Sequence, residues 1–256
     1  MLLGMVLLLC AAAMAELKRE EWHLPKPVAA LDAKTVQTIV AGCADCPKRR
    51  FEKSQGRWWM RQPYDLPASG EAVQRLLAIA GAPARKRHAA TEFEAKKLGL
   101  EPPRAVLEMG AVRLEFGVTD TINDDRYVRY RDEVLLVPDR FSAWLFAPAE
   151  NELDRHFLSP AKPLRDVLLD GTSRPDLLTA WTQGEAKRIV KASDATAPGG
   201  ELHYIELVEI DGTKRPWAIW HVGADYFARR AEPDLVYVFD EAAAQLLLAK
   251  LPVAVK

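Results

Sequence analysis

The sequence lacks an excess of charge of either sign. Its 256 residues include 35 Lys and Arg against 36 Asp and Glu, which gives a net charge of −1 at pH 7. General electrostatic attraction to nucleic acid or to an anionic membrane surface depends on a basic surplus. The composition therefore argues against a nucleic-acid-binding protein, and any partner must be recognised through local features.

The chain also lacks the local motifs of common nucleotide-dependent and hydrolytic enzymes. It contains no G-x-x-x-x-G-K-[ST] phosphate loop, no G-x-S-x-G nucleophile elbow and no G-x-G-x-x-G dinucleotide motif. The acidic stretch with Asp120, Asn123, Asp124 and Asp125 lacks the alternating ligands and internal glycine of a calcium loop, and we interpret it as a polar hairpin tip. We expect no enzymatic activity, no metal site and no cofactor.

Cysteine is scarce, with Cys10, Cys43 and Cys46 as the only three. Two cysteines and five scattered histidines offer no paired spacing for a zinc site. A thioredoxin-like pair opens a helix, whereas Pro47, basic residues and a predicted strand follow Cys46. We therefore predict a local disulfide between Cys43 and Cys46, with small entropic stabilisation because the loop is short. The alternative is a periplasmic thiol–disulfide protein that uses Cys43 as nucleophile and Cys46 as resolving thiol.

No long hydrophobic run is present that would span a bilayer completely. The N-terminal segment MLLGMVLLLCAAAMA, residues 1–15, falls short of the roughly 20 apolar residues needed. Its end, Ala13-Met14-Ala15, has the small-x-small pattern of a signal-peptide cleavage site. We expect export, with this segment either cleaved or retained as a membrane anchor, and residues 16–30 as a linker. The protein would then be periplasmic or anchored to the inner membrane facing the periplasm.

The first half contains strong strand and helix patterns. Residues 35–40 and 49–60 predict strands on either side of the cysteine turn, and a second turn at residues 54–56 makes a meander. Val73, Leu76, Leu77 and Ala80 share one helical face, and Gly81 marks the end of that helix. A short helix is expected over residues 91–99. Residues 104–118 and 126–138 then predict two hairpins.

The second half predicts short helices and loops over residues 153–171 and a return to strands. The expected strands lie within residues 185–193, 201–210, 215–223 and 234–239, and Asp240 is a suitable N-cap for a final helix. The fold class is α+β, with antiparallel β-meanders and flanking helices. Residues 31–147 and 148–256 are the predicted units, and duplication of one α+β unit would account for their similar element order.

Three motifs resemble the domain of unknown function 4340 family. The first is the Gly-x-Trp strand that leads to a proline and a helix start (Gly56, Trp58, Pro63, Ala68). The second is the Leu-Gly-Leu-x-x-Pro step (Leu98, Gly99, Leu100, Pro103), and the third is a Tyr-Val…Val-x-x-Val-Pro hairpin (Tyr127, Val128, Val134, Val137, Pro138). They cover about residues 31–145, and PLRDVLLD also fits. The resemblance implies a bacterial envelope protein tethered by an N-terminal hydrophobic segment, with some relatives similar to accessory parts of ABC-type transport systems, including those linked to gliding motility. It implies no catalytic residues.

Four tryptophans are candidate docking residues. Trp58 and Trp59 are adjacent on a strand and must face opposite sides, and an odd step likewise separates Trp217 from Trp220. Outward-facing aromatics can dock a partner or a sugar polymer, but they more often simply pack between the two halves. His203, His221 and Asp225 could form a polar site across a hairpin, although strand histidines beside aromatics are more often structural.

The sequence therefore predicts a non-enzymatic accessory protein of the cell envelope. Its partner would be another envelope protein, with the membrane as a second contact if the N-terminal segment is retained. The alternatives are the thiol–disulfide protein described above and a carbohydrate- or lipid-binding module that works through Trp59 or Trp220.

Overall fold

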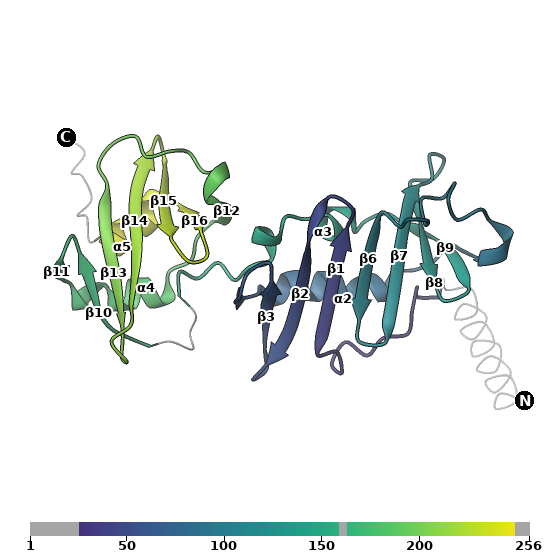
Figure 1. Cartoon of the computed structure of the whole chain (residues 1–256), viewed down its shortest axis with the longest axis horizontal. Coiled ribbons are helices and arrows are strands. Elements are labelled where there is room, and N and C mark those ends of the chain that lie inside the picture. The colour runs from purple at the N-terminus through teal and green to yellow at the C-terminus, as the bar shows by residue number, and fades with distance from the viewer. Residues whose placement is uncertain (1–25, 159–162, 249–256) are drawn as a thin grey trace, which may run out of the picture. The chain divides into compact units, whose positions relative to one another are not determined.

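The computed structural model describes residues 26–158 and 163–248, which form two mostly antiparallel sheets with short helices (Figure 1). This arrangement confirms the α+β fold class. The expected signal or anchor at residues 1–15, and the linker up to residue 25, lie outside the described residues. Contacts divide the described chain into two compact units, one of residues 26–36 and 77–141, the other of residues 37–76, 142–158 and 163–248.

The first sheet has nine strands in the order β4-β3-β2-β1-β6-β7-β8-β9-β5. Their bounds are β1 Thr38–Cys43, β2 Cys46–Ser54, β3 Arg57–Gln62, β4 Leu66–Pro67, β5 Lys86–Ala89, β6 Ala105–Met109, β7 Val112–Thr119, β8 Asp125–Tyr130 and β9 Glu133–Pro138. Burial alternates along these strands, so that β6 buries Ala105, Leu107 and Met109 while the residues between them are partly exposed. The predicted meander and both hairpins are confirmed.

Helix α2 (Gly70–Ala78) crosses behind β1 and β2 in Figure 1. Ser69 caps it, since the Ser69 Oγ accepts a hydrogen bond from the Ala72 amide at 3.3 Å. The predicted apolar face is confirmed, because Val73 and Leu76 are completely buried. A short helical turn, Ile79–Gly81, continues α2 to the predicted end.

The second sheet has seven strands in the order β11-β10-β13-β14-β15-β16-β12. Their bounds are β10 Leu164–Leu169, β11 Thr172–Ser173, β12 Arg188–Lys191, β13 His203–Glu209, β14 Lys214–Val222, β15 Asp225–Arg230 and β16 Leu235–Phe239. Helices α3 (Ser142–Leu145), α4 (Leu178–Gln183) and α5 (Glu241–Leu248) complete the described elements. Asp240 caps α5 as predicted, with its Oδ1 accepting from the Ala243 amide at 3.0 Å.

The two sheets repeat one topology. The first sheet follows the chain order β1, β2, α2, β5 and then β6 to β9, and the second follows β10, β11, α4, β12 and then β13 to β16. When these elements are matched one to one, both sheets have the same strand order, apart from the extra strands β3 and β4. In both copies the strand after the helix returns to pair with the last strand, β5 with β9 and β12 with β16. Similar short turns follow, Ala90–Glu92 and Ala192–Asp194. Duplication of one α+β unit accounts for this repeat, whereas the domain boundary at residue 147 stays a prediction.

Two local predictions were wrong, and some elements were missed. The expected helix over residues 91–99 is only a turn, Ala90–Glu92, followed by further turns. Strand β10 forms where short helices and loops were expected, because its long-range pairing with β13 supplies the ladder that local sequence does not specify. Strand β15 and helix α4 were missed, because charges at the end of β15 and the short length of α4 hide their patterns.

Candidate functional site

A disulfide joins Cys43 and Cys46 at the tip of the β1–β2 hairpin. Their Cα atoms are 5.2 Å apart, and the two residues are register partners of the hairpin. Strand β2 follows Cys46 directly, so no helix N-terminus is available to lower the pKa of a thiol there. The geometry is that of a turn clasp, and the redox state of this pair in the cell stays a prediction.

Three of the four candidate docking tryptophans are buried. Trp58, Trp217 and Trp220 have only 7%, 3% and 4% of their surface exposed. Side chains at that depth cannot contact a partner protein from the folded state. The expectation that one ring of each pair leaves the core is therefore wrong for Trp217 and Trp220, which are both buried.

Trp217 and Trp220 support two separate hydrophobic clusters on opposite faces of the second sheet. The Trp217 ring lies 5.7 Å from Trp181 and 5.1 Å from Tyr237. The Trp220 ring stacks on Phe227 at 5.5 Å and donates its Nε1 hydrogen to the Thr196 carbonyl at 3.0 Å. The odd sequence separation of Trp217 and Trp220 therefore correctly predicted that the two rings lie on opposite faces of the sheet. It did not predict that loop residues cover the Trp220 face. Those covering residues are Val190, Ala192, Ala195 and Leu202.

Trp59 is the one of the four that remains half-buried, on strand β3. The Arg61 guanidinium lies over its ring at 5.2 Å, and Trp59 pairs with Pro67 across β3 and β4. Both residues line a cleft of about 570 Å³, a size typical of ligand-binding sites. The residues that line this cleft all belong to one compact unit.

The cleft combines aromatic and charged side chains. Its lining consists of Trp59, Arg61, Asp65, Leu66, Pro67, Asp154, His156, Phe157, Leu158, Glu209, Lys214, Arg215, Pro216, Trp217, Arg230, Ala231, Glu232 and Tyr237. Trp59 and Trp217 could be identified as candidates from the sequence, whereas the others could not, because the lining comes from five separate stretches of the chain.

A short connecting segment, residues 153–157, links stretches of the chain that line the cleft. Leu153 bridges to Ala68, and the Asp154 amide donates to the Pro67 carbonyl at 2.9 Å. Only three residues later, the Phe157 amide donates to the Gly184 carbonyl at 3.2 Å. Phe157 is buried among the aromatic residues of the second sheet. The segment is therefore hydrogen-bonded at both ends.

Most cations of the cleft have carboxylate partners. Arg61 Nη1 lies 2.5 Å from Asp65 Oδ1, Lys214 Nζ lies 2.8 Å from Glu206 Oε2, and Arg215 pairs with Glu209. These charges are therefore largely neutralised before any ligand arrives.

Arg230 differs from the other cations of the cleft. It faces Trp217 across the β14–β15 pair, and its guanidinium lies 5.7 Å from the centroid of the Trp217 ring. Its Nε and Nη2 donate to the Glu232 main-chain carbonyl at 3.1 and 2.8 Å. Within the part of the chain that the structure describes, Arg230 makes no ion pair with a carboxylate. Tyr237 lies beside it: burial raises the pKa of the Tyr237 hydroxyl, and Arg230 counteracts that rise.

A buried ion pair lies outside the cleft, and no sequence pattern indicated it. Arg49 on β2 is 1% exposed, and its Nη1 lies 2.7 Å from Glu152 Oε1. The same guanidinium donates to the main-chain carbonyls of Trp144 and Leu145 at the end of α3. Burial raises the pKa of the Glu152 carboxyl to about 7, although the Arg49 charge opposes this rise.

The free energy of unfolding is expected to fall as the pH rises from 4.5 to about 7. The folded protein binds the Glu152 proton more tightly than the unfolded chain does, whose pKa is near 4.5. This stabilisation is complete below the unfolded pKa and disappears above the folded one. The full effect is about 3 kcal/mol, from about 1.4 kcal/mol for each pKa unit. Urea unfolding at a series of pH values measures it.

Glu152→Gln should flatten this pH dependence, because the titrating group is gone. Glu71→Gln is the matched control, since the Glu71 side chain is 81% exposed and its replacement should leave the slope unchanged. An equal slope in wild type and Glu152→Gln would contradict the assignment to Glu152.

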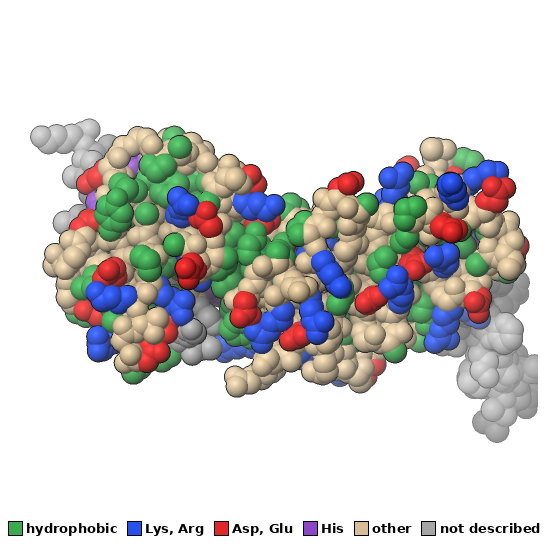
Figure 2. All heavy atoms as spheres, in the orientation of Figure 1, with side chains coloured by type: hydrophobic (Ala, Val, Ile, Leu, Met, Phe, Trp, Pro, Cys, Tyr) green, Lys and Arg blue, Asp and Glu red, His purple; other side chains and the backbone are tan. Residues whose placement is uncertain are grey.

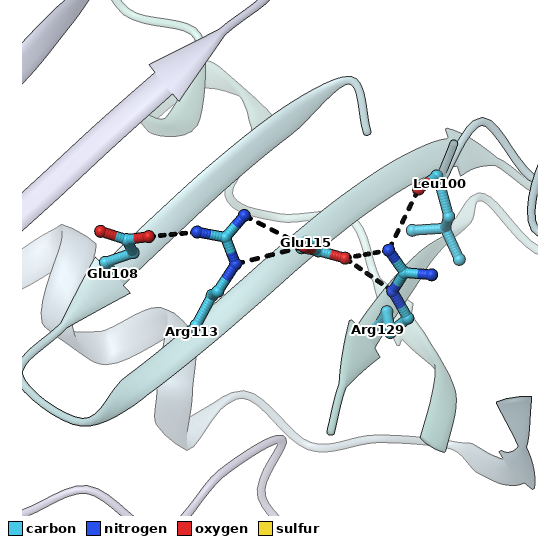
Figure 3. Close-up of polar contacts among 5 residues, drawn as sticks. All are labelled: Leu100, Glu108, Arg113, Glu115 and Arg129. Atoms are coloured by element: carbon cyan, nitrogen blue, oxygen red, sulfur yellow. Dashed lines mark hydrogen bonds and ion pairs between the residues drawn. The ribbon is translucent and has the colours of Figure 1, made fainter. Parts of the chain in front are cut away.

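A row of alternating charges runs across the outer face of β6, β7 and β8 (Figure 3). Arg113 contacts both Glu108 and Glu115, and Arg129 Nε donates to Glu115 Oε2 at 2.6 Å. Arg129 also donates to the Leu100 carbonyl at 3.3 Å. The arginines are neutralised within the row, and Figure 2 shows basic and acidic side chains interspersed over the visible face. This sheet face is therefore a solvated surface rather than a basic binding patch.

The remaining polar candidates do not assemble into a site. His203 Nδ1 lies 2.9 Å from Asp170 Oδ2, while His221 stacks on Tyr226 with ring centroids 5.4 Å apart. Among the described residues, no group of three or more His, Cys, Asp or Glu is placed to hold a metal ion. Residues 120–124 form the turn between β7 and β8, whereas Asp125 is the first residue of β8 and is buried.

No helix in the described ranges 26–158 and 163–248 is both long enough and apolar enough to cross a membrane.

Comparison with known proteins gives one match. No curated protein and no solved structure matches the chain significantly. A family model described as "Domain of unknown function (DUF4340)" matches residues 58–167. This range begins at Trp58 and contains two of the three motifs completely, together with connecting segment 153–157. The resemblance to the domain of unknown function 4340 family is therefore confirmed for residues 58–167 of this chain.

Proposed function

We propose that this protein is a non-catalytic accessory subunit of a bacterial cell-envelope assembly, such as an ABC-type transport system, and that it binds a partner protein in the cleft beside Trp59. The observation that carries this proposal is a cleft of about 570 Å³ whose wall includes the half-buried Trp59. Tryptophan, tyrosine and arginine dominate the binding energy of protein interfaces, and the cleft contains all three residue types.

The location in the envelope is part of the proposal. It is supported by the apolar residues 1–15, by what the family resemblance implies, and by a disulfide between Cys43 and Cys46, which suits an oxidising compartment. The segment at residues 1–15 would serve as a signal peptide or as an anchor.

The two alternatives have weaker support. A thiol–disulfide enzyme needs an activated thiolate, and Cys46 leads into a strand rather than standing at a helix start. A carbohydrate- or lipid-binding module that works through Trp220 would need an exposed ring, whereas Trp220 is stacked under loop residues. Such a module could use only Trp59, in the same cleft.

Trp59→Ala should remove the partner protein. The tagged protein would be cross-linked in its native host, recovered from the envelope fraction and analysed for co-purifying proteins by mass spectrometry. Truncation of an interface hot spot costs about 2 kcal/mol or more, so the yield of the true partner should fall at least about tenfold.

Trp144→Ala is the matched control, because Trp144 is 37% exposed and does not line the cleft. A protein that is lost with Trp59→Ala and retained with Trp144→Ala supports the proposal. If Trp59→Ala folds normally and keeps every partner of the wild-type protein, the cleft is not the docking site.

A further inference from the structure

Arg230 in the cleft has N–H donors available for a ligand. A guanidinium has five N–H donors, and the Glu232 carbonyl accepts two from Arg230. The Tyr237 hydroxyl beside it can accept one more, which leaves two donors for an incoming group. The Glu232 contact also fixes the orientation of the guanidinium, so that little side-chain entropy is lost on binding.

The surroundings of Arg230 strengthen its attraction for an anion. The guanidinium lies against the Trp217 ring, and Tyr237 on the same face is 2% exposed. Charges interact more strongly in such partly desolvated surroundings than in water. Guanidinium groups bind carboxylates with charge-assisted hydrogen bonds of good geometry.

The other lining residues restrict the class of ligand. Asp65, Asp154, Glu209 and Glu232 bring four carboxylates to the cleft, which balance its four Lys and Arg residues, so the lining has no positive surplus to attract a polymer with repeated negative charges. In the described ranges of the chain, the lining contains no Asn, Gln, Ser or Thr, the neutral hydrogen-bonding side chains that suit sugar hydroxyls. Apolar walls are instead abundant, with Leu66, Pro67, Phe157, Leu158 and Pro216 beside the aromatic residues. A single carboxylate flanked by apolar groups fits these features best.

We propose that the cleft binds a peptide segment of the partner protein in which one acidic side chain, bound to Arg230, is flanked by aromatic or aliphatic residues that pack on Trp59. This inference rests on the proposed function, since it names what the partner presents. Trp59 and Arg230 have separate roles: the first gives apolar contact area, and the second selects the carboxylate.

Two matched peptides test this inference with the purified full chain. The first has a central glutamate flanked by leucine and phenylalanine, and the second has glutamine in place of the glutamate. Fluorescence anisotropy should show that the glutamate peptide binds about tenfold more tightly, and that its affinity falls as salt is added. This comparison uses the wild-type protein and requires no variant to fold. Equal affinities for the two peptides would overturn the inference.

Variants then test whether Arg230 causes the preference for the glutamate peptide. Arg230→Gln should abolish the preference for glutamate, while Glu232→Gln should increase the affinity about twofold because it removes a nearby negative charge. Arg229→Gln is the matched control, since Arg229 pairs with Asp234 and does not line the cleft. A preference that persists in Arg230→Gln would overturn the assignment. Arg230-dependent binding of an acidic oligosaccharide such as oligogalacturonate, without binding of the peptide, would overturn the peptide class.

The two proposals fail in distinguishable ways. If Trp59→Ala removes the cellular partner but the two peptides bind equally, docking stands and only carboxylate recognition is wrong. If the glutamate preference depends on Arg230 but Trp59→Ala keeps every partner, the peptide site stands and the proposed docking role is wrong.

Discussion

Replacement of Arg49 by methionine should lower the free energy of unfolding by about 3–5 kcal/mol, since removing one member of a buried ion pair leaves the other charge uncompensated. The Arg49 side chain is 1% exposed and the Glu152 side chain 4%. The variant also loses the hydrogen bonds to the carbonyls of Trp144 and Leu145. Urea unfolding followed by circular dichroism measures the change.

The cost of Arg49→Met should depend on pH. Without Arg49 nothing opposes the rise that burial causes in the pKa of Glu152. The cost should therefore be smaller at pH 5, where Glu152 is protonated, than at pH 8, where an unpaired carboxylate is buried. A double variant with methionine at both positions should recover most of the lost stability.

Arg50→Met is the matched control for Arg49→Met. The neighbouring Arg50 lies on the same strand, but its side chain is 45% exposed and pairs with Glu52 at the surface. Such surface pairs contribute about 0–1 kcal/mol. If Arg49→Met and Arg50→Met cost the same, the ion pair between Arg49 and Glu152 does not form as described.

Trp181→Ala is expected to cost about 3–5 kcal/mol, as is usual when a buried aromatic side chain is removed. Trp181 is completely buried, and its ring packs against Phe157 and Trp217 at 5.5 and 5.7 Å. Its Nε1 also donates to the Leu247 carbonyl at 3.1 Å, which connects α4 to α5. Loss of this side chain therefore weakens the core and the contact between two helices together.

The cleft should also respond to Trp181→Ala, because Phe157 and Trp217 contact Trp181 and line the cleft. Thermal unfolding and the peptide affinity can be measured on the same sample. Trp144→Ala, at a partly exposed position, should change stability by less than about 1 kcal/mol. Comparable losses in the two tryptophan variants would contradict the central position of Trp181.

Elements with strong periodicity could be predicted from the sequence. The face of α2 formed by Val73 and Leu76, the alternating strand β7 and the cap at Asp240 each depend on residues close together in the chain. Strand β10 depends on pairing with β13, about 40 residues away, and its own sequence does not specify that partner. Helix α4 has only six residues, so packing of Trp181 rather than helix propensity stabilises it.

The candidate site was only partly predictable for a similar reason. The adjacent tryptophans indicated that one ring must leave the core, and the structure identifies it as Trp59. Arg230 could not be recognised, because its importance comes from facing Trp217 across two strands and from the lack of a carboxylate partner among the described residues. The pair of Arg49 and Glu152 joins residues 103 positions apart, which no local pattern reveals.

The repeated topology creates a risk of misassembly during folding. The matched strands of the two sheets belong to one chain and are therefore at high effective concentration. Repeat proteins characteristically exchange such strands or pair them wrongly. The outermost strands limit this risk because all of them are short: β4 and β11 have two residues each, and β5 and β12 have four each. Pro67 on β4 and the basic residues of β5 and β12 further discourage edge pairing. The chain thus carries two copies of one sheet order whose borders offer little template for joining to each other or to a neighbouring molecule.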